Sequence, residues 1–194
     1  MKNNNIIKHP LFVGNAITSV VAMATNTLVI DFVLSSGMNV YQMQLFAITL
    51  VGLVTSVIVT KNKALTKVAF KHFETFLVIE AAINVALGLT TLIVGSPMIY
   101  VVSSILLVPF SRIQKYGTNA LVTSAFASAE ERLEFDNATA TYGSFIGVAG
   151  IVVGFVLNRT ISGQMAFCIL CLSEVINNVF YYKTYIAVKA KTKN

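Results

Sequence analysis

Two glutamates that lie within long apolar stretches of this sequence could take up and release protons. Glu80 and Glu174 each begin the same short pattern, E-x-x-x-N-V. A charge near the centre of a lipid bilayer costs about 2.5–3.5 kcal/mol, so a carboxylate there needs a partner or a wet cavity, and it commonly marks an ion pathway. Asp31, near the end of another apolar stretch, is a third such carboxylate. The sequence therefore predicts proton coupling through Glu80, Glu174 or Asp31.

Two basic residues offer a structural role for the same carboxylates. Arg112 and Lys115 share one apolar stretch, and either of them could pair with a glutamate and hold two helices together. Removing one member of a buried ion pair strands the other charge and costs about 3–5 kcal/mol. A proton pathway and a structural ion pair are therefore alternative interpretations of Glu80 and Glu174.

Uncharged polar residues in the apolar stretches predict a cavity beside these charges. On a helix with roughly 100° between successive residues, Asn15, Ser19 and Asn26 fall within about 40° of one another and form a polar stripe. Arg112 and Asn119 also share a helix face. The residues that we expect to line a cavity or to contact a substrate are Asn15, Ser19, Asn26, Asn84, Arg112, Asn119 and Asn178. For single Asn and Ser residues, interhelical hydrogen bonding is the alternative.

Four glycines in one apolar stretch predict a helix-packing face. Gly143, Gly147, Gly150 and Gly154 lie within about 60° of one another on a helix. Small residues let a neighbouring helix approach closely. We expect this face to pack against another helix, and an interface that slides during gating is the alternative.

No residue set in the sequence predicts catalysis, a metal site or a cofactor. His9 and His72 are far apart. Cys168 and Cys171 form a C-x-x-C pattern inside an apolar stretch, where packing is the expected role. Phosphate-binding glycine loops, H-E-x-x-H and G-x-S-x-G are missing from the sequence, and these are the motifs that would indicate an ATPase or a hydrolase. We therefore expect a protein that is not an enzyme and binds no metal and no cofactor.

The composition indicates the elements that must position these residues. Hydrophobic residues make up 56% of the 194 residues, charged residues make up 11%, and the mean hydropathy is +0.76, whereas a soluble domain has about 25% charged residues. This composition excludes a soluble enzyme, a disordered chain and a disulfide-stapled secreted domain. A membrane-spanning helix needs about 20 apolar residues. Six stretches have that length: 11–33, 40–60, 73–94, 98–126, 138–157 and 164–182.

The fold class that follows is an all-α integral membrane protein with six transmembrane helices in one domain, residues 1–194. The first stretch lacks a clear cleavage site, so we expect it to stay as an uncleaved span. Lys and Arg residues gather at both chain ends and in the loops on one side, whereas Arg159 is alone on the other side. By the positive-inside rule both termini face the cytoplasm, in a cell membrane. The same rule accounts for the net charge of +6 without nucleic acid.

The two E-x-x-x-N-V patterns also indicate an internal repeat. They lie in the third and sixth spans, which run in opposite directions across the membrane. A 3+3 inverted repeat, which is common in transporters, would place Glu80 and Glu174 symmetrically. Chance similarity between two short patterns is the alternative.

Three parts of the chain carry a family resemblance. They are LFVGNAIT at 11–18, FSR at 110–112 with its continuation to AEERL at 129–133, and the glycine-containing segment 142–154 with LSE at 172–174. On these residues the chain resembles the amino-terminal six-helix half of a major facilitator superfamily transporter of the macrolide-efflux-like branch. It departs from that family in segment 61–67, which lacks Asp-Arg, and at Ile151, where antiporters often have a proline after the glycine.

The resemblance implies a membrane transporter half that performs proton-coupled efflux of a small amphipathic molecule, as an antiporter does. Because the family has twelve helices in two halves, it also implies assembly as a homodimer or with a second six-helix half. The lipid bilayer and a small-molecule substrate are the other expected partners. Two alternatives remain open: a non-transporting accessory, immunity or regulatory subunit, and a six-helix substrate-binding component of a vitamin-uptake complex.

Overall fold

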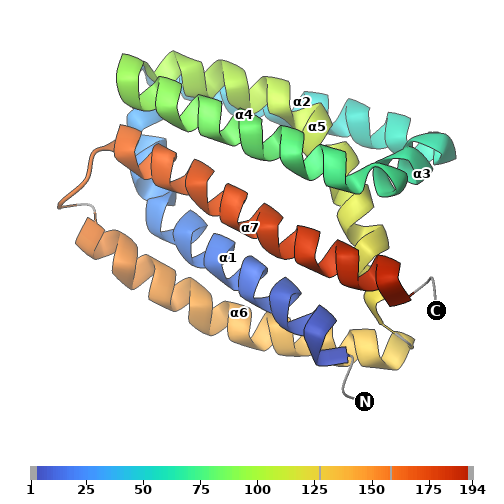
Figure 1. The fold of residues 1–194 in the computed structure, drawn as a ribbon. Helices are drawn as coiled ribbons and strands as arrows, with labels where there is room; N and C mark the ends of the chain where they lie inside the picture. The colour runs from blue at the N-terminus through green and yellow to red at the C-terminus, as the bar shows by residue number, and fades with distance from the viewer. Residues whose placement is uncertain (1–3, 127, 158, 192–194) are drawn as a thin grey trace.

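The computed structural model describes residues 4–126, 128–157 and 159–191, and this part of the chain is helical, without strands. Its helices are α1 (Asn4–Leu34), α2 (Met38–Lys61), α3 (Lys63–Lys71), α4 (Phe73–Val94), α5 (Pro97–Ala125), α6 (Ala129–Leu157) and α7 (Gly163–Lys191) (Figure 1). All of them except α3 are long and apolar enough to cross a membrane. These six helices confirm the number and order predicted from apolar length, and they fit a multi-pass membrane protein.

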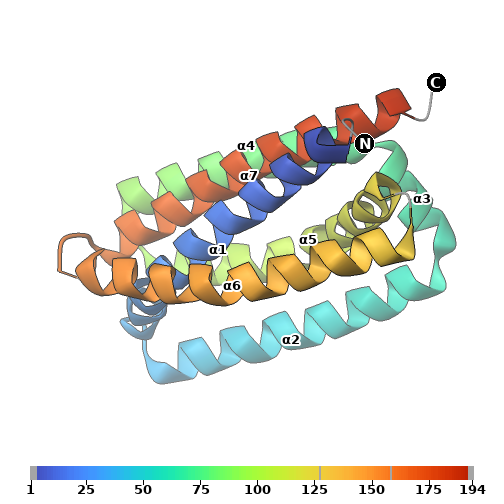
Figure 2. The ribbon, with the colours of Figure 1, turned by 90° about the horizontal axis from the view of Figure 1, so that it is seen from below.

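The six long helices lie side by side in one bundle, in which α7 packs against both α1 and α4 (Figure 1, Figure 2). α1 also packs against α6, and α2 packs against α5. Both described ends of the chain lie at one end of the bundle together with α3, whereas the turns after α1, α4 and α6 lie at the other end (Figure 1, Figure 2). The basic residues of α3 and of the carboxyl end of α7 therefore share one end of the bundle.

Two apolar clusters pack against α7 and leave a polar stretch between them. The cluster near the carboxyl end of α7 includes Leu11, Phe73, Leu77, Leu121 and Tyr185. The cluster near its amino end includes Leu28, Val29, Ala166, Phe167 and Cys171. The segment of α7 from Ser173 to Tyr181 lies between these clusters, so its polar side chains are held at the middle of the helix.

α4 and α7 approach each other closely at Gly88. A Cβ atom at this position would lie 3.2 Å from Cβ of Cys171 and 3.6 Å from Cα of Cys168. Near the end of α4, the side-chain amide of Gln164 donates a hydrogen bond to the Gly95 carbonyl oxygen over 3.2 Å. These contacts hold together the two helices that carry Glu80 and Glu174, and the two free thiols take part in that packing.

The segment 61–72, which the sequence predicts as a loop, contains the short helix α3. At its start, Oδ1 of Asn62 accepts a hydrogen bond from the Ala64 N–H over 3.1 Å, a capping arrangement that asparagine favours. Phe70 of α3 packs against the cluster that contains Phe73. A search for long apolar stretches detects membrane spans. It misses a short helix such as α3, which is stabilised by the Asn62 cap and by the packing of Phe70.

Three long helices extend well beyond their predicted spans, and one of them is α1, which begins at Asn4 rather than at 11. α6 begins at Ala129 rather than at 138, because Oγ of Ser128 accepts a hydrogen bond from the Glu131 N–H over 3.1 Å and acidic residues in the first turn favour a helix amino end. α7 continues past the predicted end at Tyr182 to Lys191. Apolar length reports the part of a helix that matches the hydrocarbon core, and polar helical turns lie outside it.

The four glycines of α6 divide into two pairs. A Cβ atom at Gly154 would lie 2.6 Å from the Ala24 carbonyl oxygen, and one at Gly150 would meet the same helix, α1, at 2.7 Å. This pair lets α1 approach α6 closely. A Cβ atom at Gly143 or Gly147 would have no such neighbour within 4 Å. Within the described chain, the predicted packing face is therefore in contact only at Gly150 and Gly154.

Candidate functional site

A cavity of about 310 Å³ lies between α4, α5 and α7, and we name it the polar cavity. Each residue that lines it carries a polar group on its side chain: Glu80, Ser111, Gln114, Lys115, Thr118, Asn119, Glu174, Asn177, Asn178 and Tyr181. The fold thus brings both glutamates of the E-x-x-x-N-V patterns to one place. Of the residues expected to line a cavity, Asn119 and Asn178 lie there too.

Two helices supply most of this lining at regular helical spacing. α7 contributes Glu174, Asn177, Asn178 and Tyr181, which follow the spacing i, i+3, i+4, i+7 of one helix face. α5 contributes Ser111, Gln114, Lys115, Thr118 and Asn119 at the same spacing. The sequence prediction missed Ser111, Gln114, Thr118, Asn177 and Tyr181. The periodic polar residues within two apolar helices are the signal that could have found them.

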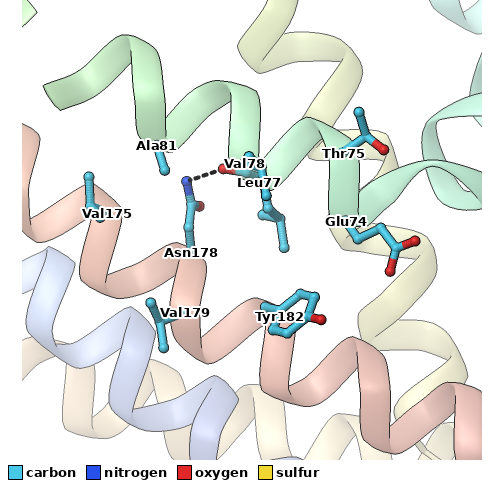
Figure 3. A pocket seen from close by; sticks show the side chains of 9 residues that line it. All are labelled: Glu74, Thr75, Leu77, Val78, Ala81, Val175, Asn178, Val179 and Tyr182. Atoms are coloured by element: carbon cyan, nitrogen blue, oxygen red, sulfur yellow. Dashed lines mark hydrogen bonds between the residues drawn. The ribbon is translucent and has the colours of Figure 1, made fainter. Parts of the chain in front are cut away.

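Amide groups from two helices surround the Glu80 carboxylate. It accepts a hydrogen bond from the side-chain amide of Gln114 on α5, and the Asn178 amide of α7 lines the same cavity. Asn178 donates to the Leu77 carbonyl oxygen of α4 over 3.3 Å (Figure 3). The Asn84 side chain instead donates to the backbone carbonyl of Glu80 on its own helix over 3.0 Å. Asn84 is therefore outside the polar cavity, contrary to the prediction.

Glu174 shares the cavity with a buried amide. Asn177 lies three residues after Glu174 on α7 and lines the same cavity, and it is only 8% exposed. Its Oδ1 accepts no hydrogen bond from any described residue. This oxygen lies against α1, where a Cβ atom at Gly14 would be 2.7 Å from it. A residue that lines the polar cavity therefore has a buried acceptor without a donor, and this acceptor is turned toward α1.

Neither glutamate forms an ion pair with a residue that the structure describes, and neither does Lys115, although it lines the same cavity. Arg112 is not among the lining residues. Its guanidinium extends toward α2, where a Cβ atom at Gly52 would lie 3.2 Å from Nη2. The geometry therefore gives no support to a structural ion pair at the glutamates, and it places Arg112 outside the cavity in which the sequence predicts it.

The polar stripe predicted on α1 does not face a single cavity. Asn15 is linked to the polar cavity indirectly, because its Oδ1 accepts a hydrogen bond from the Tyr181 hydroxyl over 2.8 Å. Asn26 lines a separate cavity of about 150 Å³ with residues of α2 and α5. Ser19 and Asp31 are exposed and line neither of these two cavities. Asp31 therefore lies apart from the two glutamates.

An apolar groove of about 500 Å³ lies beside the polar cavity, between α4 and α7 (Figure 3). Its apolar lining is Leu77, Val78, Ala81, Val175 and Val179. Glu74, Thr75 and Tyr182 lie toward one end of it (Figure 3). Asn178 lines both the groove and the polar cavity. The groups that can titrate or bind charge at mid-helix belong to the polar cavity, which is therefore the candidate site.

Comparison of the chain with family models, with curated proteins and with solved structures gives no match. The function of the polar cavity is therefore argued from the chemistry of its lining residues and from the helices that hold them.

Proposed function

We propose that this chain is half of a membrane transporter that couples the movement of a small molecule to protons through Glu80 and Glu174. One observation carries the proposal: both carboxylates line the same polar cavity between membrane-length helices, and neither forms an ion pair with a described residue. An unpaired carboxylate in such surroundings is costly as a charge. Uptake of a proton or of a cationic group lowers that cost.

The lining supports an exchange of one proton for one positive charge on a substrate. With both carboxylates ionised, Glu80, Glu174 and Lys115 give the cavity a net charge of −1, and protonation of one glutamate makes the lining neutral. A bound cationic group favours the ionised carboxylate, because an opposite charge nearby stabilises the charged form. Protonation in turn favours release of that group. This competition is the basis of antiport.

Polar side chains on the surface of the spans support assembly with a second six-helix half. The exposed polar side chains of the spans include Ser19 and Asn26 on α1, and Arg112, Lys115 and Asn119 on α5. In a lone bundle these side chains would face lipid, at a cost of about 2.5–3.5 kcal/mol for an Arg or Lys near the bilayer centre. A homodimer or a second six-helix half would cover them.

Helix packing supports a 3+3 inverted repeat. Exchanging the first three long helices for the last three relates α1 to α5, α2 to α6 and α4 to α7. The packing of α1 on α6 then corresponds to that of α5 on α2, and the packing of α1 on α7 corresponds in position, but not in extent, to the smaller contact of α5 with α4. In such a repeat, Glu80 and Glu174 would occupy equivalent places on two helices that pack against each other.

The distribution of basic residues supports cytoplasmic termini. Lys67 and Lys71 belong to α3, and Lys183 and Lys189 belong to the carboxyl part of α7, at the end of the bundle that holds both described chain ends (Figure 1). Arg159 lies in the turn at the other end. Basic residues collect on the cytoplasmic side of membrane proteins.

The proposal is tested with the full chain in proteoliposomes that contain the pH indicator pyranine. Ethidium, an amphipathic cation, and γ-aminobutyrate, a small zwitterion, are added in turn as probe solutes. The internal pH reports proton movement that either solute drives. We expect solute-driven proton flux in the wild type and its loss in Glu80→Gln and in Glu174→Gln. Asp31→Asn is the matched control, because Asp31 lines neither described cavity.

The same variants are checked for folding by thermal unfolding in mild detergent. Because neither glutamate forms an ion pair with a described residue, we expect both Gln variants to unfold close to the wild-type temperature. A wild type without flux for either solute would contradict the proposal. Unchanged flux in both Gln variants would contradict it as well.

A further inference from the structure

We infer that the polar cavity binds a small zwitterion, with its ammonium group at Glu80 and Glu174 and its carboxylate at Lys115. The inference rests on the proposed function, because it names the substrate class of the same site. Charges of both signs line this one cavity, and they are not paired with each other. A solute that carries both charges satisfies both kinds of side chain at once.

The lining favours a polar solute over the amphipathic molecule that the family resemblance implies. Carboxylates, an ammonium, amides and hydroxyls make up the polar cavity. An apolar surface placed there would remove these groups from water without giving them hydrogen bonds, which is unfavourable. Apolar contacts are available only next to it, in the groove lined by Val78 and Val179.

Asn177 offers the bound ammonium group a further acceptor, although its oxygen is turned toward Gly14 of α1 in this structure. It lines the polar cavity and is more than nine-tenths buried, and its Oδ1 accepts no hydrogen bond from the described residues. Buried acceptors in proteins nearly always have a donor, and an ammonium group has three N–H donors. An ammonium bound at Glu174, three residues before Asn177 on the same helix face, would supply the donor once the amide oxygen turns from α1 into the cavity.

Cavity volume limits the size of the zwitterion. The polar cavity is open to its surroundings and has a volume of about 310 Å³, and one water molecule occupies about 30 Å³ of the liquid. The space therefore suits a solute of roughly ten non-hydrogen atoms or fewer. γ-Aminobutyrate is of this size and carries its two charges at opposite ends.

The test measures thermal unfolding of the full chain in mild detergent with three matched probes. γ-Aminobutyrate has both charges, butylamine has only the ammonium, and butyrate has only the carboxylate. We expect γ-aminobutyrate to raise the unfolding temperature at a lower concentration than either singly charged probe. Lys115→Gln should weaken γ-aminobutyrate binding about tenfold, toward the level of butylamine. Glu174→Gln should weaken γ-aminobutyrate and butylamine and leave butyrate unaffected.

Two further variants distinguish an effect of the positive charge at Lys115 from a general effect of substitution on folding. Lys115→Arg keeps the positive charge and should keep the preference for the zwitterion. Lys183→Gln is the matched control, because Lys183 lies over the Phe180 ring and does not line the polar cavity. Equal affinity for γ-aminobutyrate and butylamine in the wild type overturns the inference. An unchanged preference in Lys115→Gln, or no stabilisation by any of the three probes, overturns it too.

The outcomes also distinguish this inference from the proposed function. Ethidium-driven proton flux without stabilisation by γ-aminobutyrate would overturn the inference and leave the transporter proposal in place. Stabilisation by γ-aminobutyrate that depends on Lys115, without proton flux for any solute, would overturn the transporter proposal and leave the zwitterion site in place.

Discussion

The hydroxyl of Tyr181 on α7 donates a hydrogen bond to Oδ1 of Asn15 on α1 over 2.8 Å. Tyr181 lines the polar cavity, so this bond links the cavity to a helix that supplies none of its lining. The two helices are close here, since a Cβ atom at Gly14 would lie 3.0 Å from Cβ of Phe180. Asn15 therefore acts on the cavity by fixing Tyr181.

We predict that Tyr181→Phe lowers the free energy of unfolding by about 0.5–1.5 kcal/mol, the net value of a typical hydrogen bond. The loss rises toward about 3 kcal/mol if the Asn15 oxygen stays buried without a donor. Tyr182→Phe is the matched control, because Tyr182 is exposed and its hydroxyl bonds to no described residue. Thermal unfolding in mild detergent measures both variants, and equal effects would contradict the prediction.

Glycine substitutions on α6 are predicted to separate a packed position from an open one. Gly154→Ala places a Cβ atom 2.6 Å from the Ala24 carbonyl oxygen, and the backbone of α1 can only move away. We expect a loss of about 1–3 kcal/mol in the free energy of unfolding, the usual cost of overpacking.

Gly147→Ala is the control on the same helix, because a Cβ atom there would meet nothing within 4 Å. Alanine favours a helix over glycine by about 0.5–1 kcal/mol, so this variant should be as stable as the wild type or more so. Unfolding temperatures in the same detergent compare the two. A similar loss in both would mean that a second helix covers Gly147 in the assembled protein.

The fold could be predicted from the sequence as far as apolar length determines it. The thickness of the hydrocarbon core requires about 20 apolar residues per span, and all six predicted stretches are helices. Helix ends depend on caps and charges instead. The Asn62 cap of α3 and the Ser128 cap of α6 lie in polar segments, so apolar length alone missed both.

The sequence could predict those residues of the candidate site whose side chains are costly on every face of a membrane-spanning helix. Glu80 and Glu174 could be identified because a carboxylate in a membrane span is expensive wherever it points. For other residues the face matters, and packing decides the face. Lys115 lines the polar cavity, whereas Arg112, one turn earlier on α5, extends toward Gly52 of α2. The sequence pattern places Arg112 in the cavity, because the positions of α2 and α7, which decide between the two residues, cannot be read from the sequence.

Arg112→Gln is predicted to leave solute-driven proton flux unchanged. The guanidinium of Arg112 is outside the polar cavity and pairs with neither glutamate. The pyranine assay measures this variant beside Glu174→Gln, which should lose the flux. Loss of coupling in Arg112→Gln with a normal unfolding temperature would show that a second half or another conformation brings Arg112 to the carboxylates.

Cysteine labelling is predicted to show that both termini face the cytoplasm. Ser162 is exposed in the turn before α7, and Ala64 is exposed at the start of α3, at opposite ends of the bundle (Figure 1). In intact cells a membrane-impermeant maleimide should label Ser162→Cys and should not label Ala64→Cys, because the basic end faces the cytoplasm. Ser96→Cys should react more slowly, since Ser96 is half-buried.

The labelling background carries Cys168→Ala and Cys171→Ala, so that the introduced thiol is the only reactive one. Alanine keeps Cβ of Cys171, the atom that would lie 3.2 Å from a Cβ atom at Gly88, and the close approach of α4 and α7 should therefore persist. After permeabilisation, Ala64→Cys should react as fast as Ser162→Cys, which shows that its earlier protection came from the membrane. Labelling of Ala64→Cys in intact cells, with Ser162→Cys protected, would reverse the orientation and place the basic end outside.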